Sequence, residues 1–159
     1  MSESQRSVVV ARGGGPTIEG PVGGPLTFKV RGGQTGDALT AFENVIRSRE
    51  GPPMHVHTHQ DESWYVLQGD LRFALHGDLA AASAGTLVFV RRGTPHCFQN
   101  VGDTPARILV LFTPSGMERF FERFADLPAG RFDPDSFRTA GAEAGMDVVG
   151  PPLAVSHPI

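Results

Sequence analysis

The segment GPPMHVHTHQDESWYVLQG (residues 51–69) places three histidines within five residues and a pair of carboxylates directly behind them. His55, His57 and His59 stand at alternate positions, which is the spacing of side chains on one face of a β-strand. Asp61 and Glu62 follow. Imidazoles in such a row can bind a metal ion, lie exposed in solvent without a role, or belong to an affinity tag, and the rest of the chain distinguishes these alternatives.

Short apolar segments bounded by turn residues lie on both sides of the histidine row. They span residues 26–30, 38–48, 63–68, 71–75, 86–90, 96–100 and 106–112. With the histidine segment they amount to about eight strands, at the even spacing of a β-sandwich or barrel. The 20 glycines and 13 prolines favour tight turns between short strands. We therefore expect an all-β domain.

Beyond residue 112 the apolar residues recur at helical spacing, which predicts a helix over 115–127. Ser115, with Glu118 three residues later, has the spacing of a capping box at its start. A second, weaker helix is predicted over 133–146, with Pro134 in its first turn. The chain is interpreted as one domain, residues 1–159, with an N-terminal arm (1–25), a barrel core (about 26–112) and a C-terminal helical extension (113–149).

Composition and charge exclude several classes of function. The net charge of -3, without a lysine or arginine stripe, predicts no nucleic-acid partner. No run approaches the ~20 apolar residues of a membrane span, and the N-terminus lacks a signal-peptide pattern, so we expect a cytoplasmic protein. The single cysteine, Cys97, excludes a disulfide framework and a thiolate-rich zinc site. A chain of 159 residues can bury a sufficient core without a structural metal, so any metal is expected to serve function.

A second segment, GTLVFVRRGTPHCFQN (residues 85–100), complements the histidine row. Together the two segments resemble the two sequence motifs of the cupin superfamily, over roughly residues 40–112. The first motif has the form H-x-H-x4-E-x6-G and is matched by His55, His57, Glu62 and Gly69. The second has the form G-x5-P-x-G-x2-H-x3-N and is matched by Gly85, Gly93, His96 and Asn100, with Arg91 in place of the usual proline.

The resemblance implies a small antiparallel β-barrel of the jelly-roll type, with His55, His57, Glu62 and His96 pointing into its lumen as metal ligands. This nitrogen and oxygen set suits one divalent transition metal (Fe, Mn, Ni, Co, Cu or Zn) and does not choose among them. His55 and His57 share a strand face, but Glu62 has the other parity, so a turn or bulge at residues 58–61 has to re-aim it inward. Asp61 itself is expected to be an exposed, inert turn carboxylate.

A competing register uses His57 and His59, so that His59 replaces His55 as a ligand. This register matches the glycine spacing better and the carboxylate spacing worse. We prefer His55 and His57, because reaching back to the carboxylate needs the four-residue turn. His59 is then predicted at the mouth of a substrate pocket. Phe98, on the same strand face as His96, is predicted to form an apolar wall of that pocket.

Among cupins, the sequence resembles the flavonol (quercetin) 2,3-dioxygenases in phrases such as DESWYVLQG and GTPHCFQN. This implies a metal-dependent dioxygenase for a small enolisable or aromatic, flavonol-like substrate, with Glu62 as the catalytic base that takes the hydroxyl proton of the substrate. A metal-dependent polyketide cyclase or isomerase and a non-catalytic metal-cupin that binds a small ligand are the alternatives. Small cupins commonly pair, which suggests a homodimer.

Overall fold

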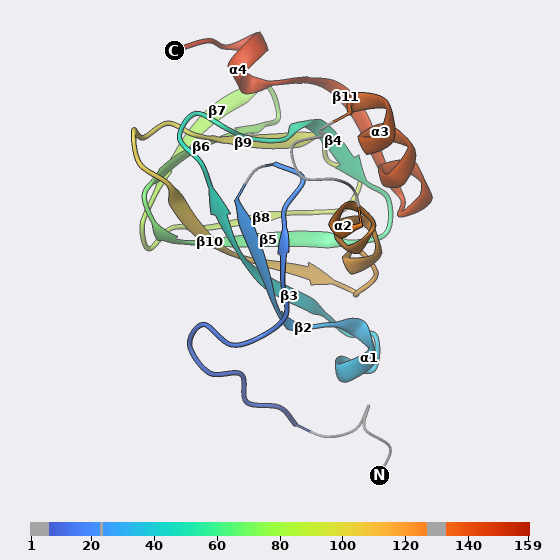
Figure 1. Ribbon diagram of the computed structural model, residues 1–159. Helices are drawn as coiled ribbons and strands as arrows, with labels where there is room; N and C mark the ends of the chain where they lie inside the picture. The colour runs from blue at the N-terminus through green and yellow to red at the C-terminus, as the bar shows by residue number, and fades with distance from the viewer. Residues whose placement is uncertain (1–6, 23, 127–132) are drawn as a thin grey trace.

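The structure, a computed structural model, describes residues 7–22, 24–126 and 133–159. Within these ranges the chain forms two antiparallel sheets that lie face to face as two layers (Figure 1). The larger sheet has the strand order β1-β2-β3-β10-β5-β8, with the bounds Thr17–Glu19, Pro25–Val30, Thr40–Ile46, Ala106–Thr113, Asp61–Gln68 and Leu87–Val90. The smaller has the order β11-β4-β9-β6-β7, with the bounds Met146–Pro152, Pro53–His57, His96–Asn100, Asp70–Leu75 and Asp78–Ser83. The all-β, jelly-roll prediction is confirmed.

Alternation along the strands sends one set of side chains into the space between the sheets. In β5, Glu62, Trp64 and Val66 are buried, whereas Tyr65 and Leu67 face solvent. The same period of two recurs in β10, where every second side chain is buried. Interior positions of both sheets contribute to one hydrophobic cluster. The lumen of the barrel is therefore the core of the protein.

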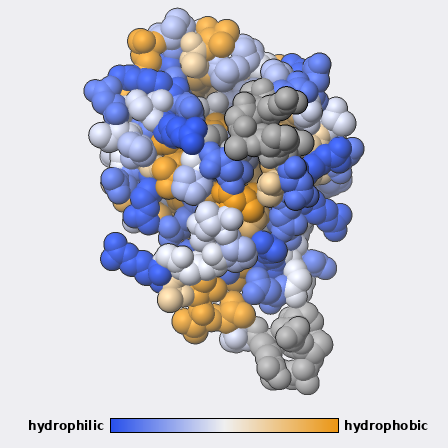
Figure 2. Space-filling view, in the orientation of Figure 1, coloured by the Kyte–Doolittle hydropathy of each residue, from blue (hydrophilic) through white to orange (hydrophobic). Residues whose placement is uncertain are grey.

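The helices lie outside the sheets, whereas the predicted N-terminal arm contributes β1 to the larger sheet. The described ranges contain the helices α1 (Gly32–Thr35), α2 (Glu118–Ala125), α3 (Pro134–Glu143) and α4 (Leu153–Ser156). Figure 1 shows α2 at one end of the barrel and α3 beside β11. Most of the surface in the same view is hydrophilic, and apolar side chains gather over the arm, where Val8 and Val9 are exposed (Figure 2). No helix in the described ranges is long and apolar enough to cross a bilayer.

The start of α2 corrects the predicted capping box. Met117, not Ser115, occupies the cap position, and the helix begins at Glu118. The Glu118 carboxylate instead accepts hydrogen bonds from the Thr40 hydroxyl (2.5 Å) and the backbone N–H of Gly32 (2.9 Å). These donors from distant parts of the chain act together with a local one, the backbone N–H of Gly116 (2.8 Å), and they tie α2 to β3 and α1. Residue 127 of the predicted helix, and residues 1–6 and 23 of the predicted arm, lie outside the described residues.

Three edge strands are missing from the sequence prediction: β1, which lies in the predicted arm, β7 and β11. The sequence of β7, DLAAAS, has small exposed side chains and no clear alternation. The sequence of β11, MDVVGPP, contains two prolines, which a sheet tolerates at its edge. Strand β11 pairs with β4, and Val148 lies opposite His55. The barrel thus extends beyond the predicted core of residues 26–112, and the C-terminal segment supports a strand that carries two predicted ligands.

Candidate metal centre

Four side chains that the two motifs contribute converge in the lumen. His55 and His57 come from β4, His96 from β9 and Glu62 from β5. Each offers one ligand atom, and these atoms all lie within 4.8 Å of one another. All four side chains are at least 95% buried, with exposed fractions of 5%, 2%, 1% and 5% in the same order. The residues predicted from the motif spacing are therefore the ones that the fold brings together, and they could hold a metal ion.

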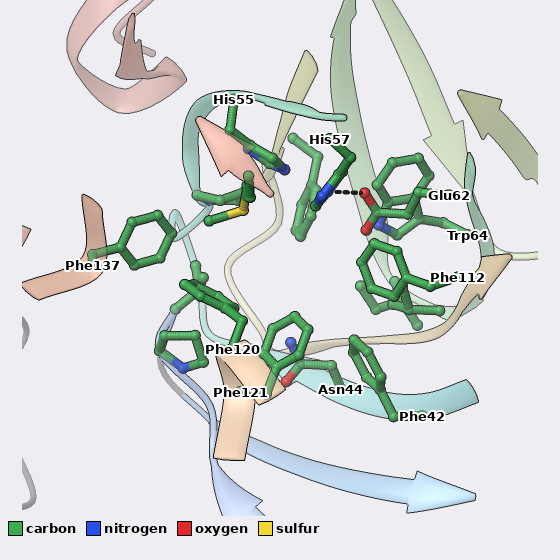
Figure 3. A pocket seen from close by; sticks show the side chains of 17 residues that line it. Phe42, Asn44, His55, His57, Glu62, Trp64, Phe112, Phe120, Phe121 and Phe137 are labelled. Carbon is green, nitrogen blue, oxygen red and sulfur yellow. Dashed lines mark ion pairs between the residues drawn. The ribbon is translucent and has the colours of Figure 1, made fainter. Parts of the chain in front are cut away.

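The strand arrangement explains how the set assembles. Strands β4 and β9 are neighbours in the smaller sheet, with His55 directly opposite His96 and their ring centroids 4.4 Å apart. After His57 the chain turns through residues 58–60 and continues as β5 in the larger sheet. The predicted re-aiming of Glu62 is thus a change of sheet, and the carboxylate faces the imidazoles from across the lumen (Figure 3).

Asp61 joins the two motif segments and is not the inert carboxylate that was expected. Its Oδ1 accepts a hydrogen bond from the backbone N–H of Arg92 (2.9 Å) and lies 3.1 Å from Nε of the same residue. Hydrogen bonding to the Arg92 side chain and backbone lowers the pKa of Asp61 below its usual value. Arg92 lies in the turn between β8 and β9, so this contact ties the start of β5 to the turn that leads to His96.

Backbone carbonyls orient two of the three imidazoles. His55 Nδ1–H donates to the carbonyl of Pro53 (2.7 Å), and His96 Nδ1–H donates to the carbonyl of Thr94 (2.8 Å). Each carbonyl lies two residues before its histidine. Because a carbonyl can only accept, the ring proton must sit on Nδ1, and in the neutral ring Nε2 then carries a lone pair. This is the outer-shell arrangement that prepares a histidine for metal binding.

The contacts of Glu62 test whether a cation fits. Its Oε2 lies 2.8 Å from Nε2 of His57 and 3.0 Å from Nε2 of His96. With the His96 proton on Nδ1, a neutral ring would direct a lone pair at the carboxylate oxygen, which is repulsive unless a proton or a cation lies between them. Both nitrogens of His57 are buried, Nδ1 has no hydrogen-bond partner within the described part of the chain, and Nε2 has only the contact with Glu62. A metal ion would resolve both problems, so the four residues fit one.

Electrostatics favours the metal-binding protonation states of His55 and Glu62. Burial, together with the neighbouring His96 and His57, lowers the pKa of His55 to about 3. Burial alone would raise the pKa of Glu62, but the imidazoles of His57 and His96 outweigh it and lower the pKa to about 2. A neutral imidazole and an ionised carboxylate are the ligand forms that coordinate a divalent metal.

The cluster lies at one side of a cavity of about 40 Å³. We call the cluster His55, His57, Glu62 and His96 the imidazole end. The other side, which we call the aromatic end, is formed by phenylalanines that the cavity lining and Figure 3 share: Phe42, Phe120, Phe121 and Phe137. Phe112 lies between the two ends, with its ring centroid 5.0 Å from that of His57 and 6.2 Å from that of Phe121. An engineered cavity of about 150 Å³ holds a benzene molecule, so this one is smaller than a single aromatic ring requires. The aromatic end has to move when an aromatic ligand enters.

Other predicted site residues divide between the cavity and the surface. Phe98 is buried and lines the cavity, at the position that the prediction gave it. His59 is exposed and does not line the cavity in the described part of the chain; its ring lies against Gly145. The predicted place of His59 at the pocket is therefore not what the structure shows. The reason is the turn after His57, which carries the chain to the outside before it re-enters as β5.

The sequence interpretation missed the polar character of two lining residues. Trp64 is fully buried, its ring centroid lies 5.3 Å from that of His96, and its indole N–H has no partner in the described ranges. Asn44 is 6% exposed and lines the same cavity. It shares the inward parity of Phe42 and Ile46 on β3. A polar residue at an inward position of an apolar strand was the signal that could have identified it.

Comparison with known proteins identifies the family. The family model described as a cupin domain matches residues 44–112, which include all four residues of the imidazole end. Solved cupin structures have the same fold: a sugar phosphate isomerase from the cupin superfamily of Silicibacter pomeroyi superimposes with a TM-score of 0.59 at 19% identity, covering 69% of this chain and 77% of its own. Residues 44–112 of this chain match the cupin domain, and the fold is that of solved cupins. The predicted resemblance to cupins is confirmed over these residues.

Two further comparisons place this chain among diverse relatives. The polyketide cyclase RemF from Streptomyces resistomycificus has a TM-score of 0.58 at 20% identity, covering 69% of this chain and 81% of its own. The mannose-1-phosphate guanylyltransferase of Escherichia coli is 26% identical over 92 residues, which is 57% of this chain and 19% of that protein. This chain spans about a fifth of the length of the curated relatives it matches. These likenesses concern the fold, on which many chemistries occur.

Proposed function

We propose that this protein is a metal-dependent dioxygenase for a small enolisable or aromatic, flavonol-like substrate. One divalent transition metal would be held by the imidazole end. The observation that carries the proposal is that a buried set of three imidazoles and one carboxylate lies directly against an aromatic-lined cavity. Such a donor set leaves coordination positions free on a six-coordinate ion. The aromatic end offers ring faces and edges on which a planar substrate can stack.

Each part of the site has a role in this reaction. The metal, when bound, would supply Lewis acidity that makes an enol or phenol hydroxyl easier to deprotonate. Glu62 would accept that proton, since its carboxylate is ionised and buried beside the ligand position. The aromatic end would close over the substrate and exclude water. Both atoms of dioxygen would enter the product, so no external reductant is required.

Oxygen consumption tests the proposal. The protein, purified without a histidine-affinity step, would be loaded separately with Fe, Mn, Ni, Co, Cu or Zn and mixed with flavonols and other enolisable aromatics. We expect at least one metal to give oxygen uptake in a fixed ratio to product, with two labelled atoms incorporated from ¹⁸O₂. Product without oxygen uptake would replace the dioxygenase by a cyclase or isomerase. Metal-dependent ligand binding without any product would indicate a binding protein.

A further inference from the structure

The two asparagines of the chain, Asn44 and Asn100, are both buried but differ in their hydrogen bonding. The Asn100 side-chain amide donates to the carbonyls of Ile46 (3.0 Å) and Thr104 (2.8 Å), and its oxygen accepts from the backbone N–H of Gly102 (2.9 Å). The side-chain oxygen of Asn44 has no hydrogen-bond partner among the described residues. Asn100 is thus a structural residue, whereas the amide of Asn44 has a cost in the folded state that nothing in the described chain offsets.

The surroundings of Asn44 offer it no partner except through the cavity. Its backbone neighbours across the sheet are Leu26 on one side and Ile108 on the other, both apolar. On a third side lies Gly20, which has no side chain to offer. A Cβ atom at this position would lie 3.4 Å from the Asn44 side-chain oxygen. Figure 3 shows Asn44 at the aromatic end, close to Phe121 and away from the imidazoles. Among the described residues the Asn44 oxygen therefore has no partner, and its side chain borders the cavity.

We propose that Asn44 is a specificity-determining residue that hydrogen-bonds a hydroxyl group at the far end of the substrate. The inference rests on the proposed function, which places the metal-binding oxygen of the substrate at the imidazole end. A hydroxyl both donates and accepts, so it satisfies the carboxamide whichever of its two polar atoms faces the cavity. The ligand class is then an aromatic enol that carries a second hydroxyl on the ring opposite the metal-binding oxygen. An analogue without that hydroxyl leaves the buried amide unpaired and is disfavoured.

Binding of a matched pair of probes tests this without turnover. The zinc-loaded protein would be titrated by calorimetry with 3,4′-dihydroxyflavone and with 3-hydroxyflavone, which lacks the distal hydroxyl. We expect wild type to bind the dihydroxy probe roughly tenfold more tightly, the effect of one buried hydrogen bond. The substitution Asn44→Leu, which nearly preserves volume, should abolish that preference and leave the affinity for 3-hydroxyflavone within about threefold. Equal binding of both probes by wild type, or an unchanged preference in the variant, overturns the proposal.

A second measurement needs no ligand. Asn44→Leu should leave the Tm unchanged or raise it, because it removes an unpaired amide from an apolar wall. Asn100→Leu, the matched control, should lower the Tm sharply or prevent folding, because it breaks the four hydrogen bonds that the Asn100 side chain makes. A fall in the Tm of Asn44→Leu as large as that of Asn100→Leu would mean a structural amide and would overturn the proposal.

The outcomes separate this proposal from the proposed function. Tight, hydroxyl-dependent probe binding without oxygen uptake by any metal form would retain the role of Asn44 and reject the dioxygenase. Oxygen uptake with no dependence of binding on the distal hydroxyl would retain the dioxygenase and reject the role of Asn44. Failure of both probes to bind the zinc-loaded wild type would reject the aromatic enol as the ligand class of Asn44.

Discussion

The imidazole end and the aromatic end of the cavity are built from different kinds of contact. At the imidazole end the side chains project from strands, and carbonyls only two residues away orient His55 and His96. At the aromatic end, Phe42 from β3 meets Phe121 from α2, with ring centroids 4.8 Å apart. The first end depends on short-range geometry within a rigid barrel, and the second on helices packed from a remote part of the sequence. The two ends should therefore respond independently to substitution, with metal retention controlled at one and substrate size at the other.

The largest expected effect is the loss of metal from the imidazole end. His57→Ala removes one of the three imidazoles and leaves Glu62 with fewer partners, so we expect metal retention to fall to background. His59→Ala, the matched control, alters an exposed histidine of the same segment and should retain the metal of wild type. Metal analysis after gel filtration measures both. Full occupancy in the His57→Ala protein would contradict the ligand set.

Substitution of Glu62 tests whether the imidazole end also performs the proton transfer. Glu62→Gln keeps the shape of the side chain and one ligand oxygen, but removes the base, so turnover should fall by roughly 10²–10⁴-fold at equal metal content. Glu43→Gln, which makes the same change on the outer face of β3, should retain full turnover. Steady-state rates of metal-matched samples measure the difference. Unimpaired turnover in Glu62→Gln would show that another group accepts the proton.

Removal of the metal separates stability from chemistry. Because the hydrophobic cluster extends through both sheets, the barrel should stay folded after chelation. The free energy of unfolding should fall only by the contribution of metal binding to the folded state, which is about 2.7 kcal/mol at a free metal concentration one hundred times Kd. Far-UV circular dichroism and denaturant unfolding before and after chelation measure it. A coil spectrum after chelation would mean that the metal is structural.

At the aromatic end, Phe121→Ala should alter the cavity without affecting the metal. Phe121 is half-buried, so the truncation should cost about 2 kcal/mol, less than for a fully buried phenylalanine. Metal content should equal that of wild type, while the affinity for bulky substrates changes relative to small ones. Thermal denaturation, metal analysis and ligand titration measure the three quantities. Loss of metal together with stability would show that the two ends are coupled.

The smallest expected effect concerns Glu118, which anchors the helix of the aromatic end. Burial raises the pKa of this carboxyl, but hydrogen bonds from Thr40 and the backbone N–H of Gly32 outweigh it and lower the pKa below 4.5. The ionised group therefore stabilises the fold at pH values above about 4.5, and this stabilisation is lost as the pH falls through the lowered pKa. Glu118→Gln should cost about 1 kcal/mol at pH 7 after allowance for partial exposure.

Denaturant unfolding of both proteins between pH 7 and pH 3 measures this contribution. The difference between wild type and Glu118→Gln should be largest near neutrality and should shrink toward the acid limit. A difference that does not change with pH would show that the carboxylate charge contributes nothing.

The sequence predicted the candidate metal-ligand residues well, but it did not predict the elements that depend on contacts between distant parts of the chain. His55, His57, Glu62 and His96 could be identified because their joint spacing resembles the two cupin motifs, although Glu62 has the other strand parity, and the structure brings these ligand atoms together. The role of β11 could not be read from MDVVGPP, because its pairing with β4 is set by the fold and not by local pattern. The predicted capping box at Ser115 was wrong for a related reason: the Glu118 carboxylate binds donors from β3 and α1 as well as the local N–H of Gly116, and the distant donors do not show in the local sequence.

The indole ring of Trp64 packs against His96, so intrinsic tryptophan fluorescence should report on metal binding at the imidazole end. Trp64 is the only tryptophan of the chain, it is fully shielded from water, and its ring centroid lies 5.3 Å from that of a predicted ligand. Its fluorescence should be blue-shifted, and a paramagnetic ion such as Cu or Ni at the imidazole end should quench it far more than Zn does. Emission intensity can therefore report which metal occupies the site, in dilute solution and in real time, without a label.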